Sequence, residues 1–420
     1  MKFRIADRDW PVLGLSIAAP VMAIMAVLVP FGLPIAAAVT ALMALYGAWR
    51  IKQPLIAPWR LAALLALMVV WSFLTVFWSA WPANVYSTLI RSVPILFGTG
   101  VLLTAALRTE PNEAWRIGRA VIAAASLLAV MVLVETLTGG ILFRSRDMLL
   151  GREPFWSYPL VSQALVVLAL MAWPAAIVAW RRGATWPAGA LLAVATAVPF
   201  TADHFSARGA MIIGLAVLAV VWWGGRVAVA AIGAGLAAII ALAPLLPLGP
   251  LNPAFYATWL PGMRNSAMHR LYIWQFTAEK VWEHPFRGWG LDASRSLPGG
   301  DRPTPVGGTL LSLHPHNVPL QLWVELGPVG VAAVLGLLTL AFIGVWRLTD
   351  DRFTRAAATS LIVAATFVSS VSFGAWQSWW LASLALIACW GVIAVKVPLA
   401  GAAAAPAAET ARRKRRSAKD

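Results

Sequence analysis

Long apolar runs separated by short polar segments make up most of this chain. Each run is about 20 residues long, the length that an α-helix needs to cross a bilayer. Backbone groups in lipid must bond within their own segment, and the runs are too continuous for alternating barrel strands. The pattern predicts an all-α, polytopic transmembrane helical bundle of about twelve spans. The spans are expected near 11–30, 32–49, 60–78, 87–107, 118–138, 159–180, 185–201, 208–224, 227–247, 318–346, 355–372 and 375–396.

One outward-facing segment, residues 248–317, interrupts the rhythm of short connections, and long loops in compact structures are usually functional. Within it Leu271, Trp274, Ala278 and Val281 recur at helical spacing, which predicts an amphipathic helix lying on the outer membrane surface. Its aromatic face favours packing and interfacial anchoring over a ligand cage. The expected organisation is nine spans in 1–247, one large outer loop in 248–317, three spans in 318–398 and a disordered basic tail in 399–420.

Composition supports the membrane assignment and explains the charge. Hydrophobic residues make up 60% of the chain and charged residues 12%, about half of what a soluble domain carries. The net charge of +16 comes mostly from basic residues in alternate connections, which by the positive-inside rule puts both termini in the cytoplasm. These basic groups begin at Lys2, Arg4 and Arg8 and end in the tail sequence RRKRR. The charge therefore indicates topology and not nucleic-acid binding, although the tail could also touch anionic membrane lipids.

The first apolar run and the single cysteine indicate little about function. The first apolar run could be a signal peptide, but the spans that follow directly favour an uncleaved first helix. The lone cysteine, Cys389, excludes an internal disulfide and gives no indication of redox compartment.

Arginines collect on the outer side, against the insertion bias. Guanidinium groups bind phosphate in a bidentate manner, so this collection favours an anionic ligand. Arg91 and Arg208 are the most informative, because arginine at membrane depth is costly and marks functional sites by default. The alternative for both is snorkelling to lipid headgroups. The outer set is Arg91, Arg144, Arg146, Arg152, Arg208, Arg264, Arg270, Arg287, Arg295 and Arg302.

A polar stripe leads into the tenth span. Asn317, Gln321 and Glu325 repeat every four residues, so they share one helix face that should point into a bundle interior or wet cavity. His316 at its mouth is a candidate general base, because its ordinary pKa lies near neutrality. The alternative is a purely structural hydrogen bond, and His314 is a weaker candidate for the same role.

Some chemistry has no sequence signal. No His, Cys or Asp cluster has metal-ligand spacing, and neither a DxD motif nor a phosphate-cradling glycine loop is present. The sequence therefore predicts no metal and no cofactor, and argues against a nucleotide-sugar enzyme or an ATP-driven machine.

The His316–Asn317 pair, followed by Gly327 and Gly330, resembles the His-Asn…Gly-x-x-Gly signature of the O-antigen ligase and O-antigen polymerase family of the bacterial inner membrane. SARGA at 206–210 and RLYIW…HPFRGWGLDASR at 270–295 are similar to that family's outer arginine segments. The resemblance implies a metal-independent glycosyltransferase with a periplasmic active site. It would transfer a glycan from undecaprenyl diphosphate to lipid A–core oligosaccharide.

The resemblance also implies roles for residues. His316 would deprotonate the acceptor, favouring direct displacement with inversion, while Arg208 and Arg270 would grip the diphosphate. Substrate binding is expected of a wider set, which is Arg91, Arg264, Arg295, Asn317, Gln321 and Glu325. A glycan polymerase of the same family and a protein-directed oligosaccharyltransferase remain open, as does a transporter of an anionic lipid, which should show broken half-helices.

Overall fold

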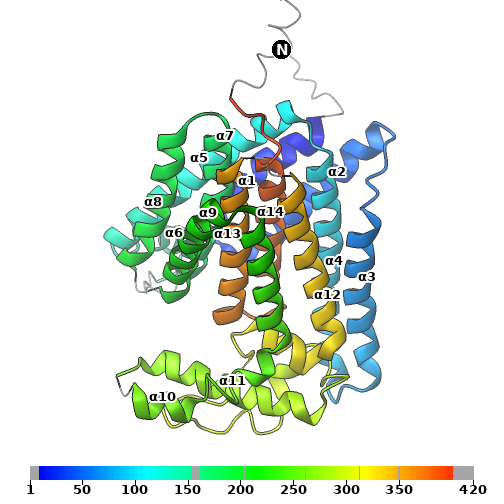
Figure 1. Ribbon diagram of the computed structural model, residues 1–420, viewed down its shortest axis with the longest axis vertical. Helices are drawn as coiled ribbons and strands as arrows, with labels where there is room; N and C mark the ends of the chain where they lie inside the picture. The colour runs from blue at the N-terminus through cyan, green and yellow to red at the C-terminus, as the bar shows by residue number, and fades with distance from the viewer. Residues whose placement is uncertain are drawn as a thin grey trace, which may run out of the picture.

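The computed structural model describes residues 9–153, 161–202, 204–260, 262–311, 313–348 and 351–400. The predicted basic N-terminal residues Lys2, Arg4 and Arg8, and the predicted tail from 401 onward, lie outside this part of the chain. Its regular structure is helical, apart from one isolated bridge between Pro303 and Thr309. A bundle of long helices is covered at one end by a layer that contains α10 and α11 (Figure 1). The predicted all-α, polytopic helical bundle is confirmed.

The bundle and its outer layer follow the chain in order. The helices are α1 (Trp10–Leu28), α2 (Leu33–Arg50), α3 (Trp59–Leu74), α4 (Pro82–Arg108), α5 (Pro111–Leu137), α6 (Ile141–Leu149), α7 (Ser162–Arg181), α8 (Thr185–Thr201), α9 (Phe205–Ala241), α10 (Pro253–Trp259), α11 (Asn265–Glu283), α12 (Val318–Leu348), α13 (Arg352–Val371) and α14 (Ser378–Ala394). Short 3₁₀ turns, η2 (Pro30–Gly32), η3 (Thr75–Phe77), η5 (Ala243–Leu245) and η6 (Ala293–Ser296), lie between some of them.

Nine helices in the described ranges are long and apolar enough to cross a membrane, and α8 and α14 are shorter apolar helices. One of the nine, α9, crosses the bundle twice. At the start of α9, the hydroxyl of Ser206 contacts that of Ser372 at the end of α13. Near the middle, Arg226 donates to the carbonyl of Trp346 at the end of α12. Near the end, the carbonyl of Ile240 accepts from the indole of Trp323 at the start of α12. The reversal occurs at Gly225, where φ is +57°. The two halves of α9 correspond to the predicted spans 208–224 and 227–247, so a helix or half-helix lies at each of the twelve predicted positions.

The predicted cytoplasmic connections meet at one end of the bundle. Arg108 donates to the carbonyl of Pro54, Arg181 pairs with Asp351 at 2.9 Å, and Lys396 donates to the carbonyl of Leu107. These contacts join segments that are far apart in sequence at the end opposite α11 (Figure 1). The alternation read from the basic residues therefore agrees with the geometry, and the cytoplasmic assignment of that end stays a prediction.

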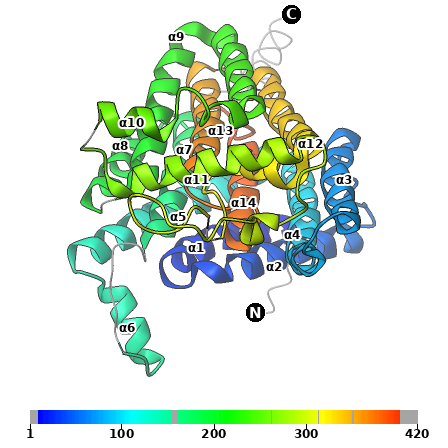
Figure 2. The same cartoon turned by 90° about the horizontal axis from the view of Figure 1, so that it is seen from below.

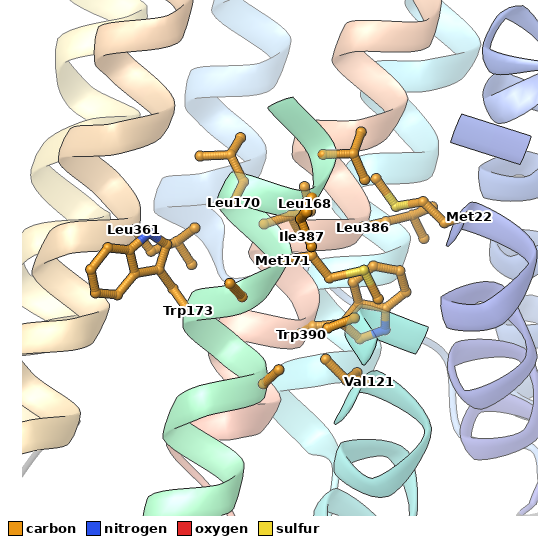
Figure 3. Close-up of a cluster of buried hydrophobic side chains, with 14 of the residues drawn as sticks. Met22, Val121, Leu168, Leu170, Met171, Trp173, Leu361, Leu386, Ile387 and Trp390 are labelled. Carbon is orange, nitrogen blue, oxygen red and sulfur yellow. The ribbon is translucent and has the colours of Figure 1, made fainter. Parts of the chain in front are cut away.

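The centre of the bundle is α7, which is buried along nearly its whole length. Trp173, Leu168 and Met171 of α7 lie among Leu386 and Trp390 of α14 and the neighbouring helices (Figure 3). Small residues allow the close approach: a Cβ at Gly214 would lie 2.4 Å from the Trp173 ring. Close packing through glycine is what stabilises helix pairs in lipid, where neighbouring tails are as apolar as the side chains.

The amphipathic helix expected in 248–317 is present as α11, but its apolar face packs against protein and not on the membrane surface. Leu271, Ala278 and Val281 are buried against protein, including the first turns of α12. The prediction that this face lies on the membrane surface is therefore wrong. The start of α12 and η5 offer apolar side chains that cover α11, so the helix crosses the outer end of the bundle (Figure 2).

A break in α12 fixes the outer segment to the bundle. Gly327 has φ +62°, and Pro328 has no N–H to donate to the carbonyl of Val324. The N–H of Trp289 donates to Val324 O at 2.8 Å and that of Gly290 to Glu325 O at 2.9 Å. The indole N–H of Trp71 donates to the third carbonyl, that of Leu326, at 2.8 Å. The freed acceptors are thus all paired, as buried backbone groups must be.

Gly327→Ala should destabilise the protein, because its positive φ is unfavourable for a residue with a Cβ, which would lie 2.6 Å from the carbonyl oxygen of Phe286. We expect a loss of about 1–3 kcal/mol in the free energy of unfolding, seen as a lower thermal midpoint in detergent. Gly344→Ala is the matched control, because a Cβ there meets nothing within 4 Å. Equal midpoints for the two variants would contradict the role given to the break.

Candidate functional site

The candidate site lies beneath α11, where the turn before α12 meets the end of α13 (Figure 2). The indole of Trp274 on α11 donates to the carbonyl of Pro315 at 2.9 Å and holds this turn in place. Gly374, after α13, gives room for the His314 ring, since a Cβ there would lie 2.8 Å from it. Three segments distant in sequence thus enclose the two histidines of the HPH sequence.

His316 is held in an unusual backbone conformation, with φ +53°. Among the described residues, only Lys52, Asp292 and His316 are non-glycine residues with positive φ, and two of these lie in the candidate site. Non-glycine residues in this region are uncommon and cluster at functional sites. The surrounding hydrogen bonds therefore maintain a conformation that the residue itself disfavours.

The hydrogen bonds of His316 define its tautomer. Its Nδ1 lies 2.6 Å from the carbonyl oxygen of Ser372, and because a carbonyl only accepts, Nδ1 carries the proton. The neutral ring then has an unprotonated Nε2, which makes no hydrogen bond to the described residues. A ring oriented by one nitrogen and basic at the other has the arrangement required of a general base.

The surroundings keep His316 neutral. Burial lowers the pKa of His316 below its ordinary value of 6.5, and the bond to Ser372 partly opposes this shift. The charges of Arg270 and His269 lower the pKa of His316 further. Arg270 on α11 is half-buried, burial lowers its own pKa, and no hydrogen bond or ion pair joins it to the described residues. An unpaired, half-buried guanidinium beside a neutral imidazole is suited to an anion.

His314 supports His316 and does not share its role. Its Nδ1 accepts the backbone N–H of His316, and the two rings meet edge to face at 4.3 Å between centroids. Burial, together with the charges of His316 and Arg295, lowers the pKa of His314 to about 3. A group with that pKa stays neutral at physiological pH and is a poor proton acceptor. The sequence-based preference for His316 over His314 agrees with this geometry.

Glu325 is the most enclosed polar group of the site, with no exposed surface. Its carboxylate accepts the backbone N–H of Asp292 at 2.8 Å, the N–H and hydroxyl of Ser294, the amide of Gln321 at 3.0 Å and the indole of Trp376 at 2.5 Å. Every acceptor direction of the carboxylate is used within the protein. Glu325 therefore orders the site, and the substrate contact predicted for it has no exposed atom to use.

The rest of the polar stripe also faces the interior, as predicted. Gln321 is buried and its amide oxygen accepts from the backbone of Ala375, which joins α12 to the α13–α14 turn. Asn317 caps α12, because its side-chain oxygen accepts the N–H of Leu320 at 3.0 Å. These bonds give both side chains a structural use, and substrate binding by Asn317 and Gln321 stays a prediction.

Asp292 gathers a second group of polar side chains. Its buried Oδ2 accepts from Thr88 at 2.7 Å and from Nε of Arg295 at 2.8 Å, and it lies 3.8 Å from a nitrogen of Arg91. Arg91 does fold toward the outer end of its helix, where it donates to the Ser87 carbonyl and the Thr88 hydroxyl. Arg91 and Arg295 are thus brought to one carboxylate, and the charge of Arg295 reaches His314.

Arg208 lies on the first turn of α9, and its side chain donates hydrogen bonds to the end of α8. Its Nε donates to the carbonyl of Pro199 at 3.0 Å and a terminal nitrogen donates to that of Ala202 at 2.8 Å. These bonds close the end of α8, whose last carbonyls have no partner within the helix. Arg264 lies exposed just before α11. Of the predicted arginines, Arg270 is the one whose charge acts on His316.

The sequence reasoning missed residues that the site depends on, above all Ser372, Asp292 and Trp376. Ser372 acts through its carbonyl, which any residue could supply, so no sequence signal identifies it. Asp292 offered a signal, since an isolated acidic residue between GWG and Arg295 in an arginine-rich segment needs a partner. In the part of the chain described, no group of three His, Cys, Asp or Glu side chains could hold a metal ion. Metal independence stays a prediction.

Fold and site together define a polytopic helical bundle of the membrane type, in which His316 lies beneath α11 and the charge of Arg270, on α11, acts on it. The sequence model of the O-antigen ligase family matches residues 205–335, which contain Arg208, Arg270 and His316. Residues 205–335 are thus similar to the O-antigen ligase family, and the resemblance seen in the sequence is confirmed over that segment.

Similar proteins occur in Rickettsia species, each carrying the provisional name polysaccharide ligase. The chain is 34% identical to the protein of Rickettsia conorii over 122 residues and 36% identical to that of Rickettsia prowazekii over 122 residues. It is 32% identical to the protein of Rickettsia bellii over 141 residues. The matches cover 28%, 28% and 31% of this chain, and 29%, 30% and 32% of the respective relatives. The similarity therefore concerns less than a third of each relative.

Glu325→Gln should destabilise the outer segment, because one carboxylate oxygen would become an amide that faces donors. We expect a loss of about 1–3 kcal/mol in the free energy of unfolding, from buried groups left without a partner. Thermal unfolding in detergent measures it. Glu279→Gln, an exposed position on α11, is the control and should leave the midpoint unchanged. A midpoint as high as wild type for Glu325→Gln would refute the ordering role.

Proposed function

We propose that this protein is an O-antigen ligase-type glycosyltransferase. It moves a glycan from undecaprenyl diphosphate to lipid A–core oligosaccharide on the periplasmic side of the bacterial inner membrane. The proposal extends the family match beyond residues 205–335 to the whole chain. In the proposed topology, membrane spans lie in 1–247 and 318–398, and residues 248–317 form a periplasmic segment between them. The tail 399–420 and both termini lie in the cytoplasm. The observation that carries it is the tautomer of His316, whose Nδ1 donates to the carbonyl of Ser372 and leaves Nε2 as the basic nitrogen of a ring on which the charge of Arg270 acts.

In the proposed reaction, Nε2 of His316 takes the proton of an acceptor hydroxyl. The acceptor oxygen attacks the anomeric carbon of the donor glycan, and the bond from that carbon to the diphosphate oxygen breaks. The diphosphate leaves with the bonding electrons, so the configuration at the anomeric carbon inverts. Arg270 stabilises the charge that develops on the leaving group, since a preorganised cation in a half-buried site needs little reorganisation.

The other predicted residues support this centre in different ways. Arg208 joins the end of α8 to the first turn of α9, and Ser206 of that turn contacts Ser372, whose carbonyl orients His316. In this proposal Arg208 shapes the diphosphate site from its edge. A glycan polymerase would use the same centre with a lipid-linked glycan as acceptor.

The transporter alternative predicted broken half-helices, and α9 and α12 do contain breaks. The break in α9 is a reversal at the end of the bundle away from the site. The carbonyls freed in α12 accept from Trp289, Gly290 and Trp71, whereas a transporter's half-helix would present them to an ion. These pairings favour the transferase.

His316→Ala should abolish glycan transfer while leaving the protein folded. His316→Asn should also abolish transfer, and it tests the general-base role more specifically. Asparagine adopts positive φ readily and can donate to the Ser372 carbonyl, but its amide nitrogen accepts no proton. The measurement is transfer by purified protein in detergent with EDTA, from an undecaprenyl-diphosphate-linked glycan, with and without lipid A–core. Transfer by His316→Asn at the wild-type rate would remove the general-base role.

The same assay separates the candidates. Acceptor-dependent transfer supports the ligase, and chain lengthening without lipid A–core supports the polymerase. A folded protein that binds the lipid-linked donor but transfers nothing would contradict both.

The pH dependence follows from the lowered pKa of His316. A base acts in its neutral form, so lowering its pKa extends activity to pH values below 6.5, and activity is lost only as pH falls through the lowered value. We expect the acid limb of kcat/KM to have its midpoint below 6.5. Arg270→Gln removes a cation that lowers this pKa, so the limb of its residual activity should move upward. A limb at or above 6.5 in wild type would contradict the proposal.

A further inference from the structure

Arg91 and Arg295 form a second group of cations that the proposed transfer step does not use. Arg295 on η6 and Arg91 on α4 approach the same oxygen, Oδ2 of Asp292, at 2.8 and 3.8 Å. The two guanidinium groups therefore meet at one atom, although they are about 200 positions apart in the chain.

The charge of this group faces outward. The Asp292 side chain is 4% exposed, whereas that of Arg91 is 51% exposed and that of Arg295 is 38% exposed. The nearby carboxylate of Glu325 is enclosed by its own donors. Both carboxylates are thus buried, and the accessible surface presents the N–H groups of Arg91 and Arg295 that are not bonded to Ser87, Thr88 or Asp292.

Arg295 and Arg270 act on different histidines of the site. The charge of Arg270 acts on His316, the rings of His316 and His314 are in contact, and the charge of Arg295 acts on His314. Arg270 thus acts on one histidine of the pair and Arg295 on the other, and no hydrogen bond or ion pair among the described residues joins Arg270 to Arg91 or Arg295. A diphosphate at Arg270 leaves the second arginine group unoccupied.

We infer that Arg91 and Arg295 are a second anion site, which binds a phosphate monoester on the acceptor glycan. This inference rests on the proposed function in one respect, namely that the ligand is the acceptor. Two forks around one point suit phosphate, which accepts bidentate bonds from guanidinium groups. An acceptor held there uses cations other than Arg270, so donor and acceptor do not compete for the same cations.

The test measures binding without requiring transfer. The full-length protein in detergent receives core oligosaccharide that carries a phosphate monoester, the same oligosaccharide after phosphatase treatment, and farnesyl diphosphate as the diphosphate probe. Wild type should bind the phosphorylated form about tenfold more tightly than the treated form, the effect of one good charge-assisted contact. The double variant Arg91→Gln/Arg295→Gln should lose this preference and keep farnesyl diphosphate binding. Arg270→Gln should show the opposite pattern.

Control variants separate a specific loss of phosphate binding from a general loss of positive charge or of folding. Arg287→Gln removes an exposed outer arginine that belongs to neither group, and it should keep both kinds of binding. Arg91→Gln alone leaves the Arg295–Asp292 pair intact, so it reports on the site if the double variant does not fold. Arg91→Lys should retain part of the preference, because charge remains while the fork is lost.

Several results would overturn the inference. These are equal binding of the two oligosaccharides by wild type, a phosphate preference that survives in Arg91→Gln/Arg295→Gln, and parallel loss of farnesyl diphosphate binding in that variant. Failure of the proposed function is a separate result. A protein with the phosphate preference but no transfer would keep the anion site and lose the transferase.

Discussion

The enclosed carboxylate of Glu325 joins segments that are far apart in sequence, and the rest of the site depends on it. Its donors come from the outer segment at Asp292 and Ser294, from α12 at Gln321 and from the α13–α14 turn at Trp376. A buried carboxylate that lost these donors would be strongly unfavourable. The three segments are therefore held at fixed distances, and those distances determine where Asp292, His314 and His316 lie.

A helix end then determines which nitrogen of His316 is basic. The last carbonyls of any helix have no partner within it, and Ser372 follows directly after the last residue of α13. His316 donates to the carbonyl of Ser372, which leaves the lone pair on the opposite nitrogen. The site thus obtains an oriented imidazole from a backbone group, where many enzymes use a carboxylate. The ring gains no nearby negative charge from this partner, which agrees with the lowered pKa of His316.

The sequence predicted what depends on local pattern and missed what depends on long-range contact. Apolar run length predicted the crossings, including the reversal at Gly225, and four-residue spacing predicted that Gln321 and Glu325 face inward. The bonds of Arg208 to α8 and the shared oxygen between Arg91 and Arg295 depend on how distant helices pack. An amphipathic face such as that of α11 shows only that something apolar covers it, and both lipid and protein satisfy that condition.

Hydrogen bonds from outside residues 205–335 to α12 and Glu325 limit how this segment could be exchanged between proteins. The family match ends at residue 335 and begins at 205, yet Trp71 and Thr75 before it, and Ala375 and Trp376 after it, make bonds to groups within it. A chimaera that transplanted only the matched segment would leave buried polar groups without their partners in both the graft and the host. The unit that is held together by these bonds is consequently wider than the matched segment, and a functional exchange must carry α3, η3 and the α13–α14 turn along with it.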